Sequence, residues 1–319
     1  MTSEQDRIAF LRERKTGIGG SDMAAIKGLS PWATAVTIWL DKTQPDNIDP
    51  SPSSPRLDLG TWLEEPLAKW YEQETGRKVQ RFSRMLRKGH VIGHIDRLVC
   101  PDGKKRAFSA HGVFAERFLE IKTTGEPSDW EEGVPAYYLD QIHTYFGLAE
   151  SLQVCDVPVV SIKPFVERDI KSVERDDEIA SQQIEFGNWW WDEYVAANKP
   201  PPCVSEEDAK AVWRVREKGK IYTATPAQVE AVKKLKSIEA AKAELDAEAS
   251  AIRADLENAM QDADTMKAED GKTLLTWRQS EGRKTTSWKS VAAELNAPAD
   301  LVEKFTVTGE PFRTFKLAI

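Results

Sequence analysis

Apolar residues recur at two spacings along the chain, and the dominant spacing changes close to residue 200. Before that point, short runs rich in β-branched and aromatic residues alternate with segments whose apolar residues stand three or four positions apart. The first pattern is typical of strands and the second of amphipathic helices. The pattern predicts a helix, a glycine turn and a second helix within 1–45, further helices at 58–75, 136–150 and 172–198, and strands near 78–87, 91–99, 117–123 and 152–166. This order predicts an α/β (α+β) fold in which helices flank a mixed central sheet.

A different pattern begins after the three prolines that follow Lys199. Because these prolines end the preceding helix, we expect two domains, 1–199 and 200–319. The segment from Thr225 to Gln228 has the residues of a capping box, with a proline at the first helical position. We expect the helix that starts there to run to about residue 262.

The long predicted helix has apolar residues in a heptad-like repeat, which Lys242 interrupts at one core position. The repeating residues are Leu235, Ile238, Leu245, Ala249, Ile252, Leu256 and Ala259. One amphipathic helix of this length needs a partner, so it would pack as a helical hairpin or as a coiled coil between subunits. Beyond it, we predict a hairpin around Asp270–Gly271, a short helix at 287–296 and a strand at 312–317, which complete a small α+β unit.

Two of the strand-like runs carry ionisable residues among apolar ones. One contains Asp96, and the other contains Glu120, Ile121 and Lys122 in succession. Because side chains alternate along a strand, Glu120 and Lys122 leave one face and Ile121 leaves the other. Two carboxylates and an ammonium group that converge in this way would form a magnesium site with a group that acts on water, which is the arrangement of metal-dependent phosphodiester cleavage. By itself, a Glu-x-Lys triplet also fits an exposed strand face that carries an ion pair.

The segment from Arg14 to Asp22 is rich in glycine and leads into an apolar run. Ser21 or Asp22 can cap the helix that follows. The free amide groups of a helix N-terminus, the Ser21 hydroxyl and the Arg14 guanidinium would together suit a phosphate. The plainer interpretation is a glycine turn into a capped helix.

Two predicted helices present polar residues beside an apolar stripe. Glu64 has this position in helix 58–75, so its carboxylate could be partly buried and face a metal, or could simply be solvated. In helix 136–150, Tyr138, Gln141 and Tyr145 share one face. Gln141 could position a phosphate or a water there, although an ordinary amphipathic helix has the same pattern.

The chain resembles the phage-type exonucleases of the YqaJ viral recombinase family in five segments that occur in a fixed order. They are the glycine–serine turn, a G-x-x-x-E helix, a G-H-I-D strand, an E-I-K strand and a Y-x-x-Q helix. The family includes the lambda-type recombination exonuclease, within the PD-(D/E)XK nuclease group. The resemblance covers about residues 5–195 and implies a PD-(D/E)XK restriction-endonuclease-like core. One departure is the segment Pro101 to Arg117, which is longer than the compact hairpin expected there.

The resemblance also implies which residues would hold a metal ion. Asp96 and Glu120 would bind Mg²⁺ or Mn²⁺, with the Ile121 carbonyl as a further oxygen ligand. Glu64 would bind the metal directly or through water, or would hold a second ion. Asp102 is a competing candidate, but the Pro-Asp-Gly sequence around it is typical of a turn.

The remaining roles concern water and DNA. By the same resemblance, Lys122 would orient or deprotonate the attacking water, and Gln141 would support the lysine or the scissile phosphate. Arg14 and Ser21 would bind the 5′-terminal phosphate of a DNA end.

Hard oxygen ligands favour Mg²⁺ or Mn²⁺ over zinc. Among the four histidines, His90 and His94 have the spacing of a helical zinc motif, but the glycines beside them favour a strand. A lysine beside a divalent ion is expected to have a lowered pKa, which would help it to act on water.

Composition limits the protein class. The net charge is −8, the hydrophobic fraction is 40%, and the sequence contains neither an apolar run of membrane-spanning length nor a signal-peptide pattern at Met1. Three widely separated cysteines indicate reduced thiols in a cytoplasm, and they are too few for the iron–sulphur exonucleases. Overall acidity is unusual for a DNA enzyme, but residues 77–106 are net basic. We interpret them as a DNA-facing stripe, with a solvated basic hairpin as the alternative.

We therefore expect a metal-dependent exonuclease that degrades one strand of linear duplex DNA from its 5′ end. It would act in phage or prophage recombination, in the cytoplasm of a bacterial host, beside a single-strand annealing protein. We expect a homo-oligomer, for which the lambda-type relatives suggest a trimer. Two alternatives stay open: a nonspecific or structure-selective DNA endonuclease on the same fold, and an inactive nuclease-fold module that binds DNA or a partner. Residues 201–319 carry no catalytic pattern and would serve oligomerisation, DNA clamping or partner docking.

Overall fold

The computed structural model describes residues 4–44, 46, 48, 54–102, 106–162, 166–282, 284–307 and 309. The chain divides into two compact units, unit 1 (Met1–Val212) and unit 2 (Trp213–Ile319). This division falls after the boundary expected at 199/200, because α7 (Glu206–Val212) packs on α3 (Ala35–Thr43). Asp208 of α7 accepts a hydrogen bond of 2.6 Å from Thr34, which caps α3.

Unit 1 is built around a mixed sheet, as predicted. Its strands, in spatial order, are β11 (Glu167–Glu174), β10 (Val154–Ser161), β8 (Arg117–Leu119), β5 (Arg97–Val99) and β2 (Val79–Arg81). β10 runs parallel to β8, and the other pairs in this order are antiparallel. β9 (Lys122–Thr124) also pairs in parallel with β10 and continues the line of β8 after a break at residues 120 and 121.

A smaller sheet supports the glycine turn. β1 (Ile18–Gly19) pairs in parallel with β4 (Val91–Gly93), which pairs in antiparallel with β3 (Leu86–Lys88). The predicted strand 91–99 is thus two strands in different sheets, and the stretch between them carries His94 and Asp96. The predicted strand 78–87 is likewise divided, into β2 and β3.

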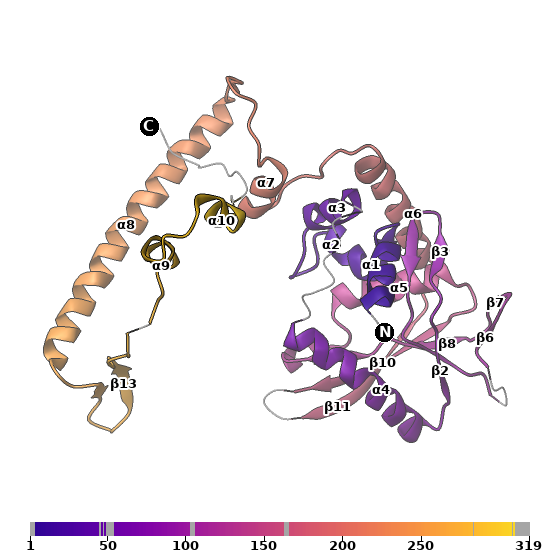
Figure 1. Ribbon diagram of the computed structural model, residues 1–319. Helices are drawn as coiled ribbons and strands as arrows, with labels where there is room; N and C mark the ends of the chain where they lie inside the picture. Colours follow the sequence, from indigo (N-terminus) through magenta and orange to yellow (C-terminus); the bar gives the residue numbers. More distant parts are fainter. Residues whose placement is uncertain are drawn as a thin grey trace. The chain divides into compact units, whose positions relative to one another are not determined.

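Helices cover both faces of the central sheet (Figure 1). α4 (Pro55–Thr75) lies on one face, while α5 (Ala136–Leu148) lies on the other, packed between α2 (Gly20–Ile26) and α6 (Asp177–Trp190). α1 (Glu4–Arg14) precedes the glycine turn. The short helix η1 (Pro127–Trp130) precedes α5, and the short helix η2 (Trp191–Ala196) follows α6. The expected fold class, a mixed sheet flanked by helices, is confirmed.

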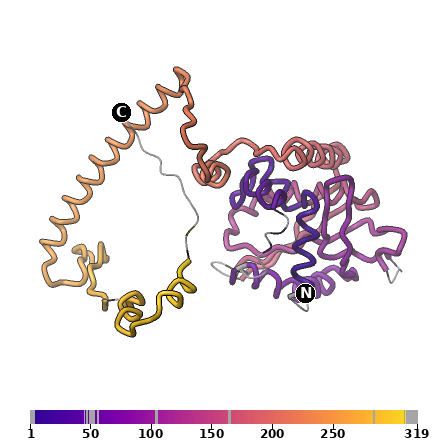
Figure 2. Tube along the Cα trace, turned by 45° about the horizontal axis from the view of Figure 1, so that its top comes forward, coloured from indigo at the N-terminus to yellow at the C-terminus, as the bar shows by residue number. Residues whose placement is uncertain are grey.

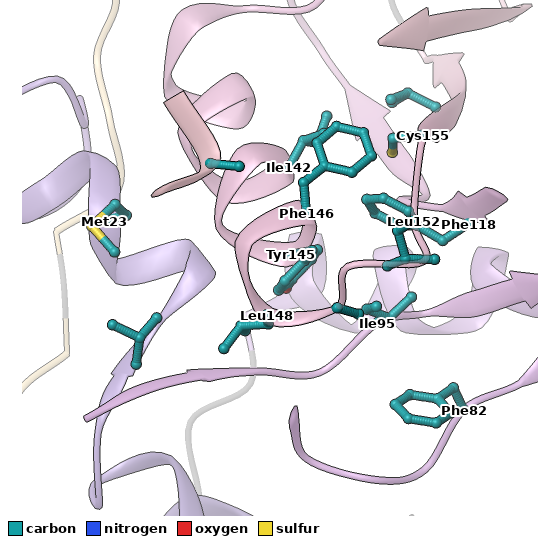
Figure 3. Close-up of a cluster of buried hydrophobic side chains, with 14 of the residues drawn as sticks. Met23, Phe82, Ile95, Phe118, Ile142, Tyr145, Phe146, Leu148, Leu152 and Cys155 are labelled. Atoms are coloured by element: carbon teal, nitrogen blue, oxygen red, sulfur yellow. The ribbon is translucent and has the colours of Figure 1, made fainter. Parts of the chain in front are cut away.

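Strand alternation divides the core between the two faces. Val99 and Leu119 pack with Tyr71 of α4, whereas their neighbours Leu98 and Phe118 belong to the larger cluster on the other side. In that larger cluster, Ile142, Tyr145 and Phe146 of α5 meet Phe118 and Leu152 (Figure 3). The catalytic candidates therefore stand at the end of strands whose two faces are both buried.

Two further elements of unit 1 differ from the sequence prediction, and one turn agrees with it. The predicted helix 172–198 begins only at Asp177, because the preceding residues form the edge strand β11. The long segment before β8 contains a short hairpin, β6 (Phe108–Ser109) and β7 (Gly112–Val113). Asp102 lies in a turn and is exposed, as the turn interpretation predicts.

Unit 2 consists mainly of α8 (Pro226–Met260), one uninterrupted helix in Figure 2. Its start is capped as predicted, since Gln228 and Thr225 exchange the two hydrogen bonds of a capping box. The remaining elements are the hairpin β12 (Thr265–Lys267) and β13 (Thr273–Thr276), α9 (Trp288–Glu294) and α10 (Ala299–Lys304). The strand predicted at 312–317 lies outside the described residues. Within the part of the chain that the structure describes, no helix is both long enough and apolar enough to cross a membrane.

Candidate active site

The antiparallel pairing of β5 with β8 brings Asp96 and Glu120 together. Arg97 is paired with Leu119, so the residues just beyond these strand ends are neighbours although they are far apart in sequence. The Oδ2 atom of Asp96 accepts a hydrogen bond of 2.9 Å from the Ile121 amide. This bond holds the Asp96 carboxylate against the break between β8 and β9.

The two carboxylate oxygens of Glu120 differ in their hydrogen bonding. Glu120 is buried, with only 3% of its surface exposed. Oε1 accepts hydrogen bonds of 2.6 Å from the Lys122 ammonium and 2.7 Å from the Gln141 amide. Among the described residues, no group donates a hydrogen bond to the buried Oε2 atom. A buried carboxylate oxygen without a partner is costly, so this atom marks a place for a cation or a donor.

The pKa values of the site follow from burial and mutual repulsion. Burial raises the pKa of Asp96 to about 8, with Glu120 adding to the rise and Lys122 opposing it. For Lys122, burial lowers the pKa, but the charges of Glu120 and Asp96 outweigh burial and the pKa is raised. A divalent cation would act in the opposite direction on both groups, because it favours the ionised acid and the neutral amine. The lowered lysine pKa expected beside an ion therefore stays a prediction.

Lys122 is fixed from three sides. Besides its bond to Glu120, its ammonium donates a hydrogen bond of 3.1 Å to the Oε1 atom of Gln141. It also lies 4.4 Å from the ring centroid of Tyr138. Gln141 in turn donates a hydrogen bond of 2.9 Å to the Tyr145 hydroxyl. The shared helix face predicted for Tyr138, Gln141 and Tyr145 thus forms one wall of the site.

Glu64 lines the same cleft but is engaged by a residue that the sequence analysis missed. The guanidinium of Arg97, a residue 3% exposed, donates hydrogen bonds to Glu64, to Glu65 at 3.0 Å and to the carbonyl of Asp96 at 2.7 Å. Arg97 therefore ties α4 to the strand end that carries Asp96. The sequence did contain one signal for Arg97: it is a charged residue directly after Asp96 in a predicted strand with apolar neighbours.

Arg14 and Ser21 are brought together as predicted. Arg14 donates a hydrogen bond of 3.2 Å to the Ser21 hydroxyl and lies 3.6 Å from the Asp22 carboxylate. The helix is capped at Gly19, whose amide donates to the Asp22 carboxylate at 2.9 Å, so neither Ser21 nor Asp22 occupies the N-cap position itself. The buried Lys42 neutralises Asp22 at 2.8 Å, which leaves the Arg14 guanidinium, 40% exposed, as the accessible cation.

Gly20 determines how close the phosphate-binding candidates lie to Gln141. A Cβ atom at this position would stand 2.8 Å from the ring of Tyr145 and 3.3 Å from Cγ of Gln141. Only glycine allows α2 to approach α5 this closely. Lys27, directly after α2, also binds Asp140 of α5 at 2.7 Å, so both ends of α2 are held against α5.

Several of these groups line one cleft of about 630 Å³, whose recorded lining does not include Ser21 or Gln141. Its lining includes Arg14, Glu64, Asp96, Glu120 and Lys122. Trp32 lines the cleft as well, 58% exposed, with its ring edge-to-face against Tyr137 at 4.9 Å. Sequence analysis did not single out Trp32, because nothing local distinguishes it from a loop tryptophan.

The donor set fits a hard divalent cation. Asp96 and the Oε2 atom of Glu120 provide carboxylate oxygens at a break in the strand, and Ile121 lines the same cleft. Within the described residues, no group of three or more His, Cys, Asp or Glu side chains converges as a metal cluster. Two carboxylates and a backbone oxygen are therefore the ligands that this site offers, with Glu64 held beside them by Arg97.

The predicted basic stripe is partly neutralised. Arg77 lies 3.9 Å from Asp156, Lys78 lies 3.4 Å from Glu72, and Lys88 lies 3.1 Å from Glu150. Lysines 104 and 105 lie outside the described residues. The stripe remains a prediction.

The mixed sheet carries Asp96 and the Glu-x-Lys groups at its strand ends, where the sequence resemblance leads us to expect them. The expected resemblance to the YqaJ viral recombinase family is confirmed, because residues 9–151 match the model of the YqaJ-like viral recombinase domain. The uncharacterized protein YqaJ of Bacillus subtilis (strain 168) is 29% identical over 274 residues, which cover 82% of this chain and 81% of the relative. That coverage exceeds the length of unit 1, so the similarity includes part of unit 2.

Solved structures with a similar fold cover about the length of unit 1. An alkaline exonuclease (LHK-Exo) from Laribacter hongkongensis is 18% identical, with a TM-score of 0.47 over 61% of this chain and 93% of that chain. Its complex with dAMP is 17% identical, with a TM-score of 0.47 over 60% of this chain and 93% of that chain. A phage related exonuclease from Haemophilus somnus 129PT is 11% identical, with a TM-score of 0.40 over 60% of this chain and all of that chain.

Proposed function

We propose that this chain is a metal-dependent DNA exonuclease that degrades one strand of linear duplex DNA from its 5′ end. The observation that carries the proposal is the buried Glu120 carboxylate, which lines the same cleft as Asp96. Its Oε1 atom is held by Lys122 and Gln141, and no described residue donates a hydrogen bond to its Oε2 atom. The YqaJ-like domain and the exonuclease names of the similar structures support a nuclease that acts on DNA. Phage or prophage recombination, beside a single-strand annealing protein, is the matching biological setting.

The ligands and the chemistry of the metal belong to this proposal. Asp96, Glu120 and the Ile121 carbonyl would hold Mg²⁺ or Mn²⁺, and Glu64 would bind it directly, through water, or beside a second ion. When bound, such an ion supplies charge neutralisation for the phosphate and an acidified water. Burial of the site strengthens these charge interactions relative to bulk water.

The protein groups around the metal would position the reactants. Lys122, fixed by Glu120 and Gln141, would orient the attacking water or take its proton. Gln141 would hold the lysine in place or contact the scissile phosphate. Because the Tyr138 ring and Gln141 restrict the ammonium, little reorganisation would be needed during the reaction.

The proposal of a 5′ end rests on the phosphate-binding candidates. Arg14 and the Ser21 hydroxyl lie together at the start of α2, and Arg14 lines the same cleft as Asp96 and Glu120. A terminal phosphate bound there would place the first phosphodiester of that strand toward the carboxylates. An endonuclease has no need of such a site.

The test compares three DNA substrates with Mg²⁺ or with a chelator. They are linear duplex with a 5′-phosphate, linear duplex without it, and covalently closed circles. We expect Mg²⁺-dependent digestion of both linear forms, faster with the phosphate, and intact circles. Cleavage of the circles would favour the endonuclease alternative, and binding without digestion of any substrate would favour the inactive module.

Arg14→Ala sharpens this test. We expect the variant to lose about tenfold in rate on the phosphorylated end, since one charge-assisted contact is removed, and to lose the preference for that end. Arg12→Ala is the matched control, because Arg12 is an exposed arginine of the same helix. A preference that survives Arg14→Ala would refute the phosphate site and leave the metal site untouched.

A further inference from the structure

Unit 2 exposes the apolar residues of its long helix. Ile238, Leu245 and Ile252 are 54%, 65% and 53% exposed. With Leu235 and Leu256 they stand three, seven, seven and four positions apart along the chain, so they form one stripe along α8. The 35 residues of α8 give a helix roughly 52 Å long. An apolar stripe of this length needs a partner.

The rest of unit 2 cannot cover this stripe with a helix. Among the described residues after α8, the helices are α9 and α10, of seven and six residues, each spanning roughly 10 Å. Strands β12 and β13 have only three and four residues. Of the hydrophobic residues that the structure describes in unit 2, Met260 alone is buried. The helical hairpin considered from the sequence therefore has no second arm among the described residues of unit 2.

The charges that flank the stripe favour α8 of a second copy of the chain as the partner. In the heptad repeat, Leu235 and Leu256 are a positions, and Ile238, Leu245 and Ile252 are d positions. Flanking the stripe are Lys234 and Glu248 at g, and Glu239 and Arg253 at e. When two such helices run parallel and in register, each g residue faces the e residue five positions later in the other copy. Lys234 then faces Glu239, and Glu248 faces Arg253, in both directions.

The antiparallel alternative is disfavoured by the same residues. If α8 met a second copy in antiparallel around residues 243 and 244, each a residue would pack against a d residue of the other copy, with e facing e and g facing g beside the seam. Asp246 would then face Glu239 in both directions, and Lys234 would face Asp255 in both directions. The two like-charge pairs would cancel the two opposite-charge pairs, whereas the parallel arrangement has opposite charges in all four pairs.

Lys242 is the one charged residue at a core position of the repeat. Glu239 and Asp246 stand three and four positions away on the same helix, so each lysine carries acidic neighbours that offset repulsion across the seam. A single polar residue at an a position lowers stability but fixes the register. Lys242 therefore favours the in-register arrangement over shifted ones.

We propose that α8 forms a parallel, in-register coiled coil with α8 of a second copy of this chain. The proposal is independent of the nuclease assignment, because it uses no residue of the cleft. It gives the exposed stripe one occupant, and it explains why a helix with few contacts inside its own unit is kept as 35 continuous residues.

The first test measures the mass of the full chain in solution by light scattering and by sedimentation. We expect the wild type to be a homomer at micromolar concentration. The double substitution Leu245→Asp with Ile252→Asp should raise the dissociation constant at least about a hundredfold, because it places charges in the seam. Ala247→Asp, an exposed residue on the opposite side of α8, is the matched control and should leave the mass unchanged. A monomeric wild type, or a double variant with wild-type mass, would overturn the proposal.

The second test determines direction. Three variants each carry one new cysteine at a d position: Ile238→Cys, Leu245→Cys and Ile252→Cys. In a parallel, in-register pair every one of them meets its own copy, so all three should form a covalent dimer under mild oxidation, and the wild type with its free cysteines gives the background. Cross-linking of Leu245→Cys alone would indicate an antiparallel pair and overturn the proposal.

Charge exchange checks the flanking pairs. Arg253→Glu alone should weaken association about tenfold, and the combination with Glu248→Lys should restore it. Failure of the combination to restore association would contradict the parallel register.

Discussion

The two units of this chain use apolar residues in opposite ways. Unit 1 buries Phe118, Phe146 and Ile142 on one face of its sheet and Tyr71 with Leu119 on the other. Unit 2 buries Met260 among its described hydrophobic residues and leaves the stripe along α8 in water. The difference teaches that unit 1 has its own hydrophobic core, whereas the structure of unit 2 would depend on the association proposed for α8.

The same contrast applies to polar groups. In unit 1 the site residues are held by buried hydrogen bonds, so that Glu120, Lys122 and Gln141 each fix another. In unit 2 the ion pairs that the structure records, such as Lys233 with Glu230, are exposed and contribute little to stability. We therefore expect the chemistry in unit 1 and the recognition of another chain in unit 2.

The largest expected effect tests whether unit 1 alone carries the chemistry. Glu120→Gln, Asp96→Ala and Lys122→Ala should each lower the Mg²⁺-dependent digestion rate by about a thousandfold or more, because each removes a charge that acts in the transition state. DNA binding, measured by fluorescence anisotropy, should be largely spared. Asp102→Asn, in an exposed turn, is the control with an unchanged rate. Unchanged digestion in any of the three site variants would refute the site assignment.

Separating the units tests the contrast in stability. A fragment of residues 1–212 should unfold cooperatively, with a melting temperature within a few degrees of the first transition of the full chain, and should sediment as a smaller species than the full chain does. Diluted residues 213–319 should lose most of their helical signal, since isolated helices are only marginally stable in water. Circular dichroism against concentration measures this loss. A diluted fragment that keeps its full helicity would contradict the contrast.

A smaller effect is expected at the exposed tryptophan of the cleft. If a nucleobase stacks on Trp32, Trp32→Ala should weaken binding of a single-stranded oligonucleotide by about 5- to 160-fold, equivalent to roughly 1–3 kcal/mol. The measurement uses the Lys122→Ala background, in which the DNA stays intact. Trp62→Ala is the matched control, because Trp62 is 72% exposed and does not line the cleft. An oligonucleotide with abasic positions should no longer distinguish Trp32 from alanine, and equal losses on both oligonucleotides would exclude stacking.

The smallest effect concerns stability at high pH. Burial, and then the hydrogen bond of 2.6 Å to Asp156, raise the pKa of Tyr71 to about 12 from a usual 10. The folded protein therefore keeps this proton while the unfolded chain releases it, so the stabilisation is complete below about pH 10 and is lost as the pH approaches about 12. Urea unfolding should show that Tyr71→Phe loses about 1.5–3 kcal/mol at neutral pH. The variant should also decline less steeply than the wild type above pH 10, and an equal decline would contradict the assignment.

Local patterns predicted what depends on local geometry. The alternation of Glu120, Ile121 and Lys122 was visible because strand periodicity is a property of neighbouring residues, and the helix face of Tyr138, Gln141 and Tyr145 was visible for the same reason. The cap of α8 depends on four consecutive residues. These features needed no knowledge of the fold.

Features that depend on distant contacts were not predictable from the pattern. The pairing of Arg97 with Glu64 requires α4 to lie over the end of β5, which no local signal gives. Strand β11 was missed because it is an exposed edge strand, with charged residues where a buried strand has apolar ones. The domain boundary was placed before α7 because the prolines end one helix, whereas the Asp208–Thr34 hydrogen bond keeps the next helix on unit 1.

The contact at Gly20 has a consequence for the product of the reaction. Since the missing side chain lets α2 rest directly on Tyr145 and Gln141, the span between the Arg14–Ser21 pair and the carboxylates is a rigid, packed length and not a loop. If a strand terminus is anchored at that pair, the protein works as a ruler. The size of each released fragment would then be dictated by helix packing and would stay constant along the DNA, whatever bases pass through.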